Sequence, residues 1–199
     1  DDLTESYWSQ ILATAVRGPA TGEQLELVPS TLTTWGAWQA EHPDTRVLRP
    51  PPESGTIDGS DGGYYVGDTY GAYEDSRLIG VTRETETGGA LHPKARVLGV
   101  TDGEAARAYP MEAVRAAGGV VNDTVGALPV VVAIGPGDAL VGYDRRVHGR
   151  ARSFARADDR HLRAGGSRWR TLSGEAVDDP HEAPTQDESN APPPLYWFA

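Results

Sequence analysis

The sequence predicts a β-rich protein of the α+β class, with short antiparallel strands, hairpins and a few short helices arranged as two internally duplicated lobes. Three features predict this fold: a tryptophan-containing segment that occurs twice, an abundance of turn residues, and apolar runs too short for long helices. The chain has 199 residues, of which 24 are glycine and 15 are proline. This composition favours short strands joined by many turns over long helices.

The repeated segment covers residues 6–16 and recurs at residues 167–177. Both copies begin with serine, carry tryptophan at the third position (Trp8 and Trp169) and end in Ala-Val. A recurrence this far apart indicates two copies of one structural unit, so each tryptophan is expected to anchor the core of its own copy. The alternative is that the tryptophans stack on a flat ligand. Because the chain begins inside one copy, we expect the first lobe to be incomplete.

The repeat divides the chain into three regions. Residues 1–49 are expected to be the tail of the first lobe, and residues 94–199 the second lobe. Between them, residues 50–93 form a Tyr- and Gly-rich connecting segment, which is longer than an ordinary connection and is expected to carry either function or disorder. Within the second lobe, the acidic and Pro-rich stretch 178–194 is expected to be mobile.

The first region contains one clear helix and one ambiguous segment. Residues 4–16 fit a short helix or a strand about equally well. A short helix follows, for which Thr33 or Thr34 can supply the N-cap, and Pro43 stops it near Glu41. Trp35 and Trp38 are three residues apart and are therefore expected to share one face of this helix.

The second lobe reads as a series of hairpins. An Asp-Gly turn at residues 102–103 joins strands at 96–100 and 105–109, and a helix over 111–117 ends at two glycines. The apolar run 129–134 predicts a strand buried on both faces. Further strands are expected as follows: one starting at 120–121, one at 139–143, and a hairpin turning at 148–149. Asn122-Asp123 is expected to begin a turn, and residues 155–166 are expected to form a polar loop.

Charge and composition limit the classes of partner. The net charge is −11, from 18 basic against 29 acidic residues, and such a surface repels nucleic acid and anionic membranes. Without cysteine, the chain has neither disulfides nor thiolate chemistry. No window reaches the roughly 20 apolar residues of a membrane span, so any signal or membrane anchor is expected upstream of Asp1.

Several motifs together resemble a widespread bacterial and archaeal family known as domain of unknown function 3179. The motifs lie at residues 6–10, 18–22, 33–38, 42–48, 108–110, 121–126 and 129–130. Each is weak alone, but their order and spacing are specific. The resemblance implies an extracytoplasmic protein, often behind a signal peptide or lipid anchor, and implies no activity. The resemblance also implies a His-Glu and a Cys-Pro pair in the first copy, where they would lie upstream of Asp1. In the second copy the corresponding positions are Gly118-Gly119 and Gly135-Pro136.

Candidate metal ligands are few and scattered. None of the five histidines forms a pair at the spacing of a zinc site. His42 with Asp44 is the best histidine candidate, and the loop containing Asp58 and Asp61 offers oxygen ligands of the kind that calcium prefers. Histidine exposed in a turn is the simpler interpretation for His42, which precedes Pro43. Cofactors remain unknown from the sequence.

Two hypotheses for function follow. The preferred one is an extracytoplasmic binding or structural accessory subunit, since the sequence has no catalytic set, and it predicts a protein partner or the missing first-lobe segment at an open sheet edge. The alternative is an enzyme or metal-binding protein with a cleft between the lobes that needs residues upstream of Asp1. The cleft candidates are Trp35, Trp38, Tyr65, Tyr70, Tyr109, Asn122 and Asp123.

Overall fold

The computed structural model describes residues 1–9, 12–26, 30–47, 73, 75–80, 84–85, 89–178 and 195–196. Strands dominate the described residues, and all the strand pairs between them are antiparallel, as the sequence predicted. The predictions for residues 50–72 and for the stretch 179–194 lie outside the described residues. The division of the chain at residues 49 and 93 stays a prediction.

The central sheet consists of β7 (Val120–Val125), β8 (Leu128–Gly135) and β9 (Ala139–Asp144), in that order. As predicted for this apolar run, β8 is buried on both faces. Its side chains alternate between two cores because successive residues of a strand point to opposite faces. Val130, Val132 and Ile134 enter one core, whereas Val131 and Ala133 enter the other.

The first core lies between this sheet and the predicted Asp-Gly hairpin. The hairpin consists of β5 (Arg96–Asp102) and β6 (Ala105–Pro110), and helix α4 (Met111–Ala116) follows it. Leu98, Tyr109 and Val114 are buried in this core. The two-residue strand β15 (Leu195–Tyr196) pairs with the outer edge of β5.

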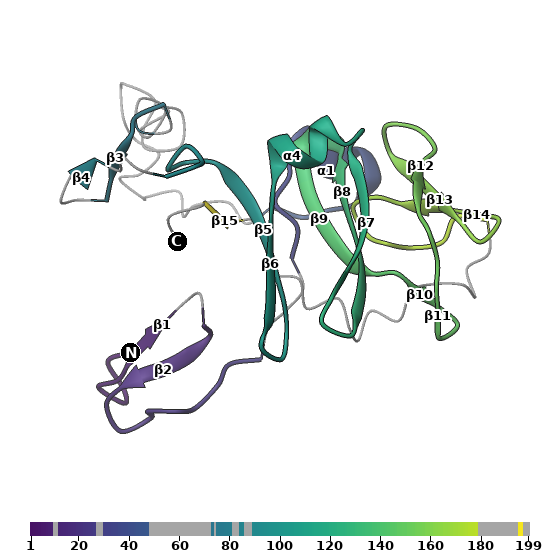
Figure 1. The fold of residues 1–199 in the computed structure, drawn as a ribbon. Coiled ribbons are helices and arrows are strands. Elements are labelled where there is room, and N and C mark those ends of the chain that lie inside the picture. The colour runs from purple at the N-terminus through teal and green to yellow at the C-terminus, as the bar shows by residue number, and fades with distance from the viewer. Residues whose placement is uncertain are drawn as a thin grey trace.

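The second core lies on the other side of the central sheet, under a series of short strands (Figure 1). These strands are β10 (Arg146–Val147), β11 (Arg150–Ala151), β12 (Ala155–Arg156), β13 (His161–Ala164) and β14 (Ser167–Arg170). The prediction of a polar loop over residues 155–166 is therefore wrong, because β12 and β13 lie within this range. Asp158, Asp159, Arg160 and Arg163 of this segment are exposed, while Leu162 and Ala164 are buried. Arg156 is partly buried and donates to the Ile134 carbonyl. A mainly polar sequence thus still forms a strand with one apolar face.

The prediction that Asn122-Asp123 begins a turn is also wrong. Strand β7 runs through both residues and turns only at Gly126, whose φ is 58°. Pairing with the buried strand β8 across all six positions of β7 outweighs the local preference of Asn and Asp for turns.

The remaining described elements lie outside the two cores. They are β1 (Tyr7–Ser9), β2 (Thr14–Arg17), α1 (Trp35–Glu41), β3 (Leu78–Ile79), β4 (Glu84–Thr85) and the 3-10 turn η1 (Pro136–Asp138). The described residues of the ambiguous segment 4–16 therefore contain strands. Helix α1 starts as predicted, with the Thr34 side chain accepting a hydrogen bond from the Ala37 N–H. Within the described residues, no helix has the length and apolar character to cross a bilayer.

Candidate functional site

Among the predicted cleft residues that the structure describes, Tyr109 and Asp123 are the two that bond to each other. The Tyr109 hydroxyl donates to Asp123 Oδ2 over 2.9 Å, and Arg107 Nη1 approaches the same oxygen at 2.5 Å. Burial acts to raise the pKa of the Asp123 carboxyl, but hydrogen bonds from the Thr124 N–H, Arg107 and Tyr109 together hold that pKa below its usual value. Burial, followed by the bond to Asp123, raises the pKa of Tyr109.

With these pKa shifts, Tyr109 and Asp123 are poorly suited to acid–base catalysis. At neutral pH the Asp123 carboxylate keeps its charge, and the Tyr109 hydroxyl keeps its proton. A general acid or base works best when its pKa lies near the working pH, and both shifts lead away from it. The group instead connects β6 to β7 across the edge of the first core.

Asn122 points away from this group because neighbouring strand residues face opposite sides. Its side-chain amide donates to the Phe154 carbonyl over 2.8 Å, and its carbonyl accepts from the Phe154 N–H over 2.7 Å. The side chain thus replaces a missing strand partner for Phe154, whose ring is buried in the second core. Its role is structural.

The tryptophans of α1 lie elsewhere. The Trp38 ring stacks on His42 with 4.1 Å between centroids, and its Nε1 donates to Thr45 over 2.9 Å. Trp35 is 50% exposed. His42 thus covers a tryptophan face, and no group of three His, Asp or Glu side chains suited to a metal is found among the described residues. Asp58, Asp61, Tyr65 and Tyr70 lie outside those residues.

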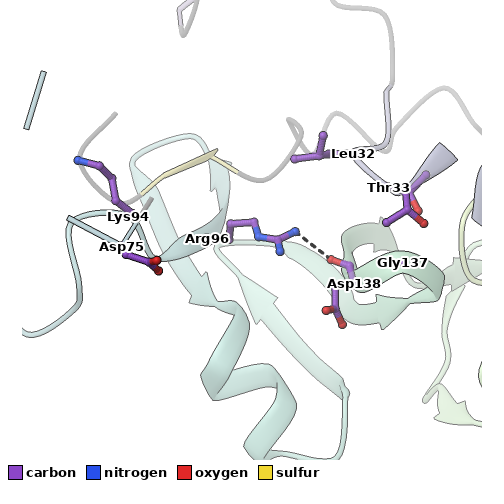
Figure 2. Close-up of a pocket in the computed structure, with 8 residues that line it drawn as sticks. Leu32, Thr33, Asp75, Lys94, Arg96, Gly137 and Asp138 are labelled. Carbon is purple, nitrogen blue, oxygen red and sulfur yellow. Dashed lines mark hydrogen bonds between the residues drawn. The ribbon is translucent and has the colours of Figure 1, made fainter. Parts of the chain in front are cut away.

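A cavity of about 820 Å³ opens beside α1. Its lining comes from the segment before α1, the start of β5 and the turn η1 (Figure 2). The lining residues are Leu32, Thr33, Thr34, Asp75, Lys94, Arg96, Gly137 and Asp138. Sequence reasoning missed this site because its residues come from separate parts of the chain and share no motif; the only available signal was the run of threonines at 31–34.

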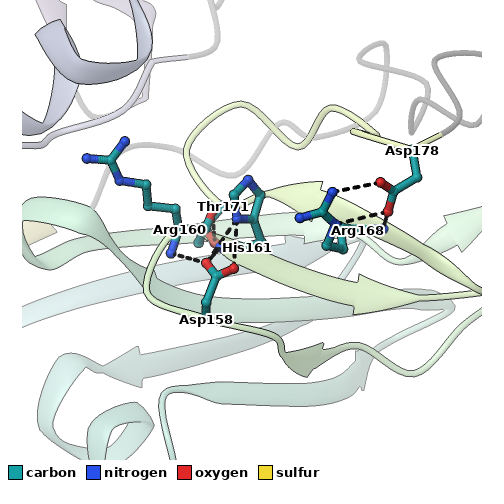
Figure 3. Close-up of polar contacts among 6 residues, drawn as sticks. All are labelled: Asp158, Arg160, His161, Arg168, Thr171 and Asp178. Carbon is teal, nitrogen blue, oxygen red and sulfur yellow. Dashed lines mark hydrogen bonds and ion pairs between the residues drawn. The ribbon is translucent and has the colours of Figure 1, made fainter.

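A polar cluster surrounds the second tryptophan segment (Figure 3). Asp158 accepts from the backbone N–H groups of Arg160 and His161 and pairs with His161 Nδ1 at 2.9 Å. The bond from the Arg160 N–H is the main cause that lowers the pKa of Asp158. The nearby Thr171 hydroxyl is buried and donates to the Arg160 carbonyl over 2.9 Å, so it is not available as a nucleophile. The cluster stabilises the loop between β12 and β13.

The two tryptophan segments share one cross-strand pair and two left-handed backbone positions. Trp8 lies opposite Ala15, and Trp169 lies opposite Ala176 at the equivalent position. The equivalence extends to the backbone before and after each tryptophan. The left-handed residues match in the two copies: Glu5 (φ 49°) with Gly166 (φ 93°), and Ala13 (φ 50°) with Gly174 (φ 72°). Residues other than glycine seldom adopt positive φ, so the two segments are alike locally. Their strand pairing differs, because β1 pairs with β2 over three positions, whereas β14 pairs with β13 and meets Ala176 by a single bridge.

The surroundings of the two tryptophans differ. Trp169 is 1% exposed, its Nε1 donates to the Ala164 carbonyl over 3.1 Å, and its ring meets Phe154 edge-on at 5.6 Å. This burial confirms the prediction for the second copy. Trp8 is only partly buried, and its indole has no hydrogen bond to a described residue. The wider two-lobe duplication stays a prediction.

The N-terminal hairpin also exposes several large apolar side chains. The large apolar side chains that are more than half exposed on it are Leu3 (97%), Tyr7 (68%), Leu12 (64%), Val16 (53%) and Leu25 (57%). The hairpin stands apart from the two cores, with no other labelled strand beside it (Figure 1). Its own loop covers the edge of β2 through bonds from Gly22 N–H to Ala15 O and from Leu25 N–H to Ala13 O.

The fold and these sites define a β-rich α+β domain with two cores around one buried strand. The chain belongs to the protein family of unknown function DUF3179, whose model matches residues 1–199. This match confirms the resemblance that the motifs indicated. No curated protein and no solved structure matches the chain.

Proposed function

We propose that this protein is an extracytoplasmic accessory subunit that binds a protein partner through its N-terminal tryptophan hairpin, residues 1–9 and 12–26. One observation carries the proposal. Two segments of similar sequence carry a tryptophan opposite an alanine, and the one with Trp169 is packed in a core while the one with Trp8 is at the surface. Apolar side chains gathered on a surface are typical of a binding site.

The second copy indicates what kind of surface the first copy fits. Trp169 shares its core with Val131, Ala133 and Val141 from the face of β8 and β9. A hairpin of the same backbone geometry, with its tryptophan in the same position, fits a sheet face of similar small apolar side chains. We therefore propose a partner that offers such a face, with Trp8 packed against it.

Charge adds a second feature of the partner. The hairpin carries the acidic residues Asp1, Asp2, Glu5, Glu23 and Glu26 and the single basic residue Arg17. A basic rim around the apolar face would steer association with this acidic segment. The second lobe also combines an apolar face with basic residues, because arginines are frequent in the strands around Trp169. The family resemblance supports the extracytoplasmic location.

Site-specific photo-crosslinking tests the proposal in cells that produce the protein. The crosslinker replaces Tyr7 or Leu12, both exposed on the hairpin, or Glu104, an exposed residue at the turn between β5 and β6. We expect one defined adduct with another polypeptide from positions 7 and 12 and none from position 104. Adding Trp8→Ala to the crosslinking variants should abolish the adduct.

Two results would refute the proposal. The first is crosslinking from position 104 equal to that from positions 7 and 12, because the contact would then be non-specific. The second is a folded chain with no adduct from either hairpin position. Sequencing the adduct tests the predicted partner face, which should be a β-sheet of valine and alanine beside basic residues.

A further inference from the structure

We propose that the cavity beside α1 binds small hydroxylated carboxylates, with Arg96 pairing with the carboxylate. The cavity measures about 820 Å³, within the range of sites that enclose small molecules. None of the residues that line it belongs to the N-terminal hairpin, so this inference does not depend on the proposed partner.

The wall of the cavity is held in place by bonds between distant parts of the chain. Thr33 Oγ1 donates to the Pro136 carbonyl over 2.8 Å, and Thr31 Oγ1 to the Leu172 carbonyl over 3.4 Å. These bonds attach the segment before α1 to the second lobe. A ligand site with a fixed wall loses less entropy on binding than a flexible one.

Gly137 is the residue that lets this wall close. It has φ 65°, and a Cβ at this position would lie 2.6 Å from Thr34 Oγ1 and 2.7 Å from Thr33 Oγ1. Any larger residue would push the two hydroxyls away from the turn. Both threonines line the cavity, so the glycine allows two hydroxyl groups to face it at the same point.

The charges around the cavity are not equally available. Lys94 Nζ donates to the Leu78 carbonyl and lies 3.8 Å from the centroid of the Tyr73 ring, so its ammonium holds the chain beside β3. The Asp138 carboxylate pairs with Arg115 at 3.2 Å. In Figure 2 this carboxylate is turned away from the Arg96 guanidinium, which approaches the Asp138 backbone oxygen instead.

Arg96 is therefore the cation best placed to bind a ligand. Its one hydrogen bond to a described residue is the 3.4 Å contact of Nη1 with the Asp138 carbonyl, whereas a guanidinium has five N–H donors. The planar fork of arginine matches a carboxylate with two parallel hydrogen bonds. Next to it, the hydroxyls of Thr33 and Thr34 and the carboxylate of Asp75 offer partners for the hydroxyl groups of the same ligand.

Titration followed by amide NMR tests the inference with a matched pair of sugars, D-glucuronate and D-glucose. The two differ in that glucuronate carries a carboxylate where glucose carries a hydroxymethyl group. We expect glucuronate at millimolar concentration to shift the amide signals of Thr33, Thr34 and Gly137, and glucose to leave them unchanged. Arg96→Gln should weaken glucuronate binding by about tenfold or more, the loss expected for a hydrogen bond to a charged group.

Arg163→Gln is the matched control, since it removes the same charge from an exposed position on β13. It should leave glucuronate binding unchanged. The inference is wrong if glucuronate shifts none of these signals in the wild-type chain, if glucose shifts them equally, or if Arg96→Gln and Arg163→Gln have the same effect. Trp8→Ala, which tests the partner proposal, should not alter glucuronate binding.

Discussion

At the scale of single residues, Asn122 shows how a local preference is overruled. Asn followed by Asp favours a turn because both side chains can bond to nearby backbone. In the structure the Asn122 amide instead bonds to Phe154, 32 residues away. The side chain satisfies both backbone groups of a residue whose ring is in the second core, so a polar residue on β7 supports the far side of the sheet.

Asn122→Ala should destabilise the fold by about 1–3 kcal/mol, since two hydrogen bonds, each with a net contribution of about 0.5–1.5 kcal/mol, are lost. The measurement is the free energy of unfolding in urea. Thr124→Ala is the control, because Thr124 lies two residues along the same face of β7 and its hydroxyl has no hydrogen bond to a described residue. Equal stability of the two variants would contradict the structural role of Asn122.

At the scale of elements, the two tryptophan hairpins separate local from tertiary causes. Both copies share one cross-strand pair and two left-handed positions, which indicates that the repeated sequence favours this turn locally. Burial differs because only the second copy has β8 and β9 beside it. One local structure is therefore a core element at one place and a surface element at another.

Trp169→Ala should cost about 3–5 kcal/mol, the usual range for removing a buried tryptophan. Trp8→Ala should cost less than about 2 kcal/mol, an ordinary value for a substitution outside a core. Urea denaturation followed by circular dichroism measures both, and Trp35→Ala, at a half-exposed site, serves as a near-neutral reference. Equal losses for Trp8 and Trp169 would mean that the two hairpins are equally buried.

At the scale of the whole molecule, β8 connects two cores that would otherwise be separate. It contributes alternate side chains to each, and its neighbours β7 and β9 pair along nearly its whole length. Two ion pairs add to this arrangement: Arg107 on β6 pairs with Asp123 on β7, and Arg168 on β14 pairs at 2.9 Å with Asp178, which follows this strand. The bond from Arg168 is the main cause that lowers the pKa of Asp178.

These lowered pKa values predict a loss of stability in acid. A carboxylate whose pKa is lower in the folded state stabilises the fold above its unfolded value of about 3.9, and this contribution disappears as the pH falls through the folded pKa. Unfolding midpoints should therefore decrease below about pH 4. Asp123→Asn should show a shallower decrease than the wild type over this range, and identical pH profiles would contradict the shift assigned to Asp123.

The sequence by itself determined the class of fold, the hairpin around Asp102-Gly103, the helix that begins at Met111 and the doubly buried strand β8. These features depend on turn chemistry and apolar patterns, which act between residues close together in the chain. The tertiary structure decided the burial of Trp8 and Trp169, the partner of Asn122 and the cavity around Arg96. These depend on contacts between segments far apart in the chain, and a pattern within one segment contains no information about what packs against it.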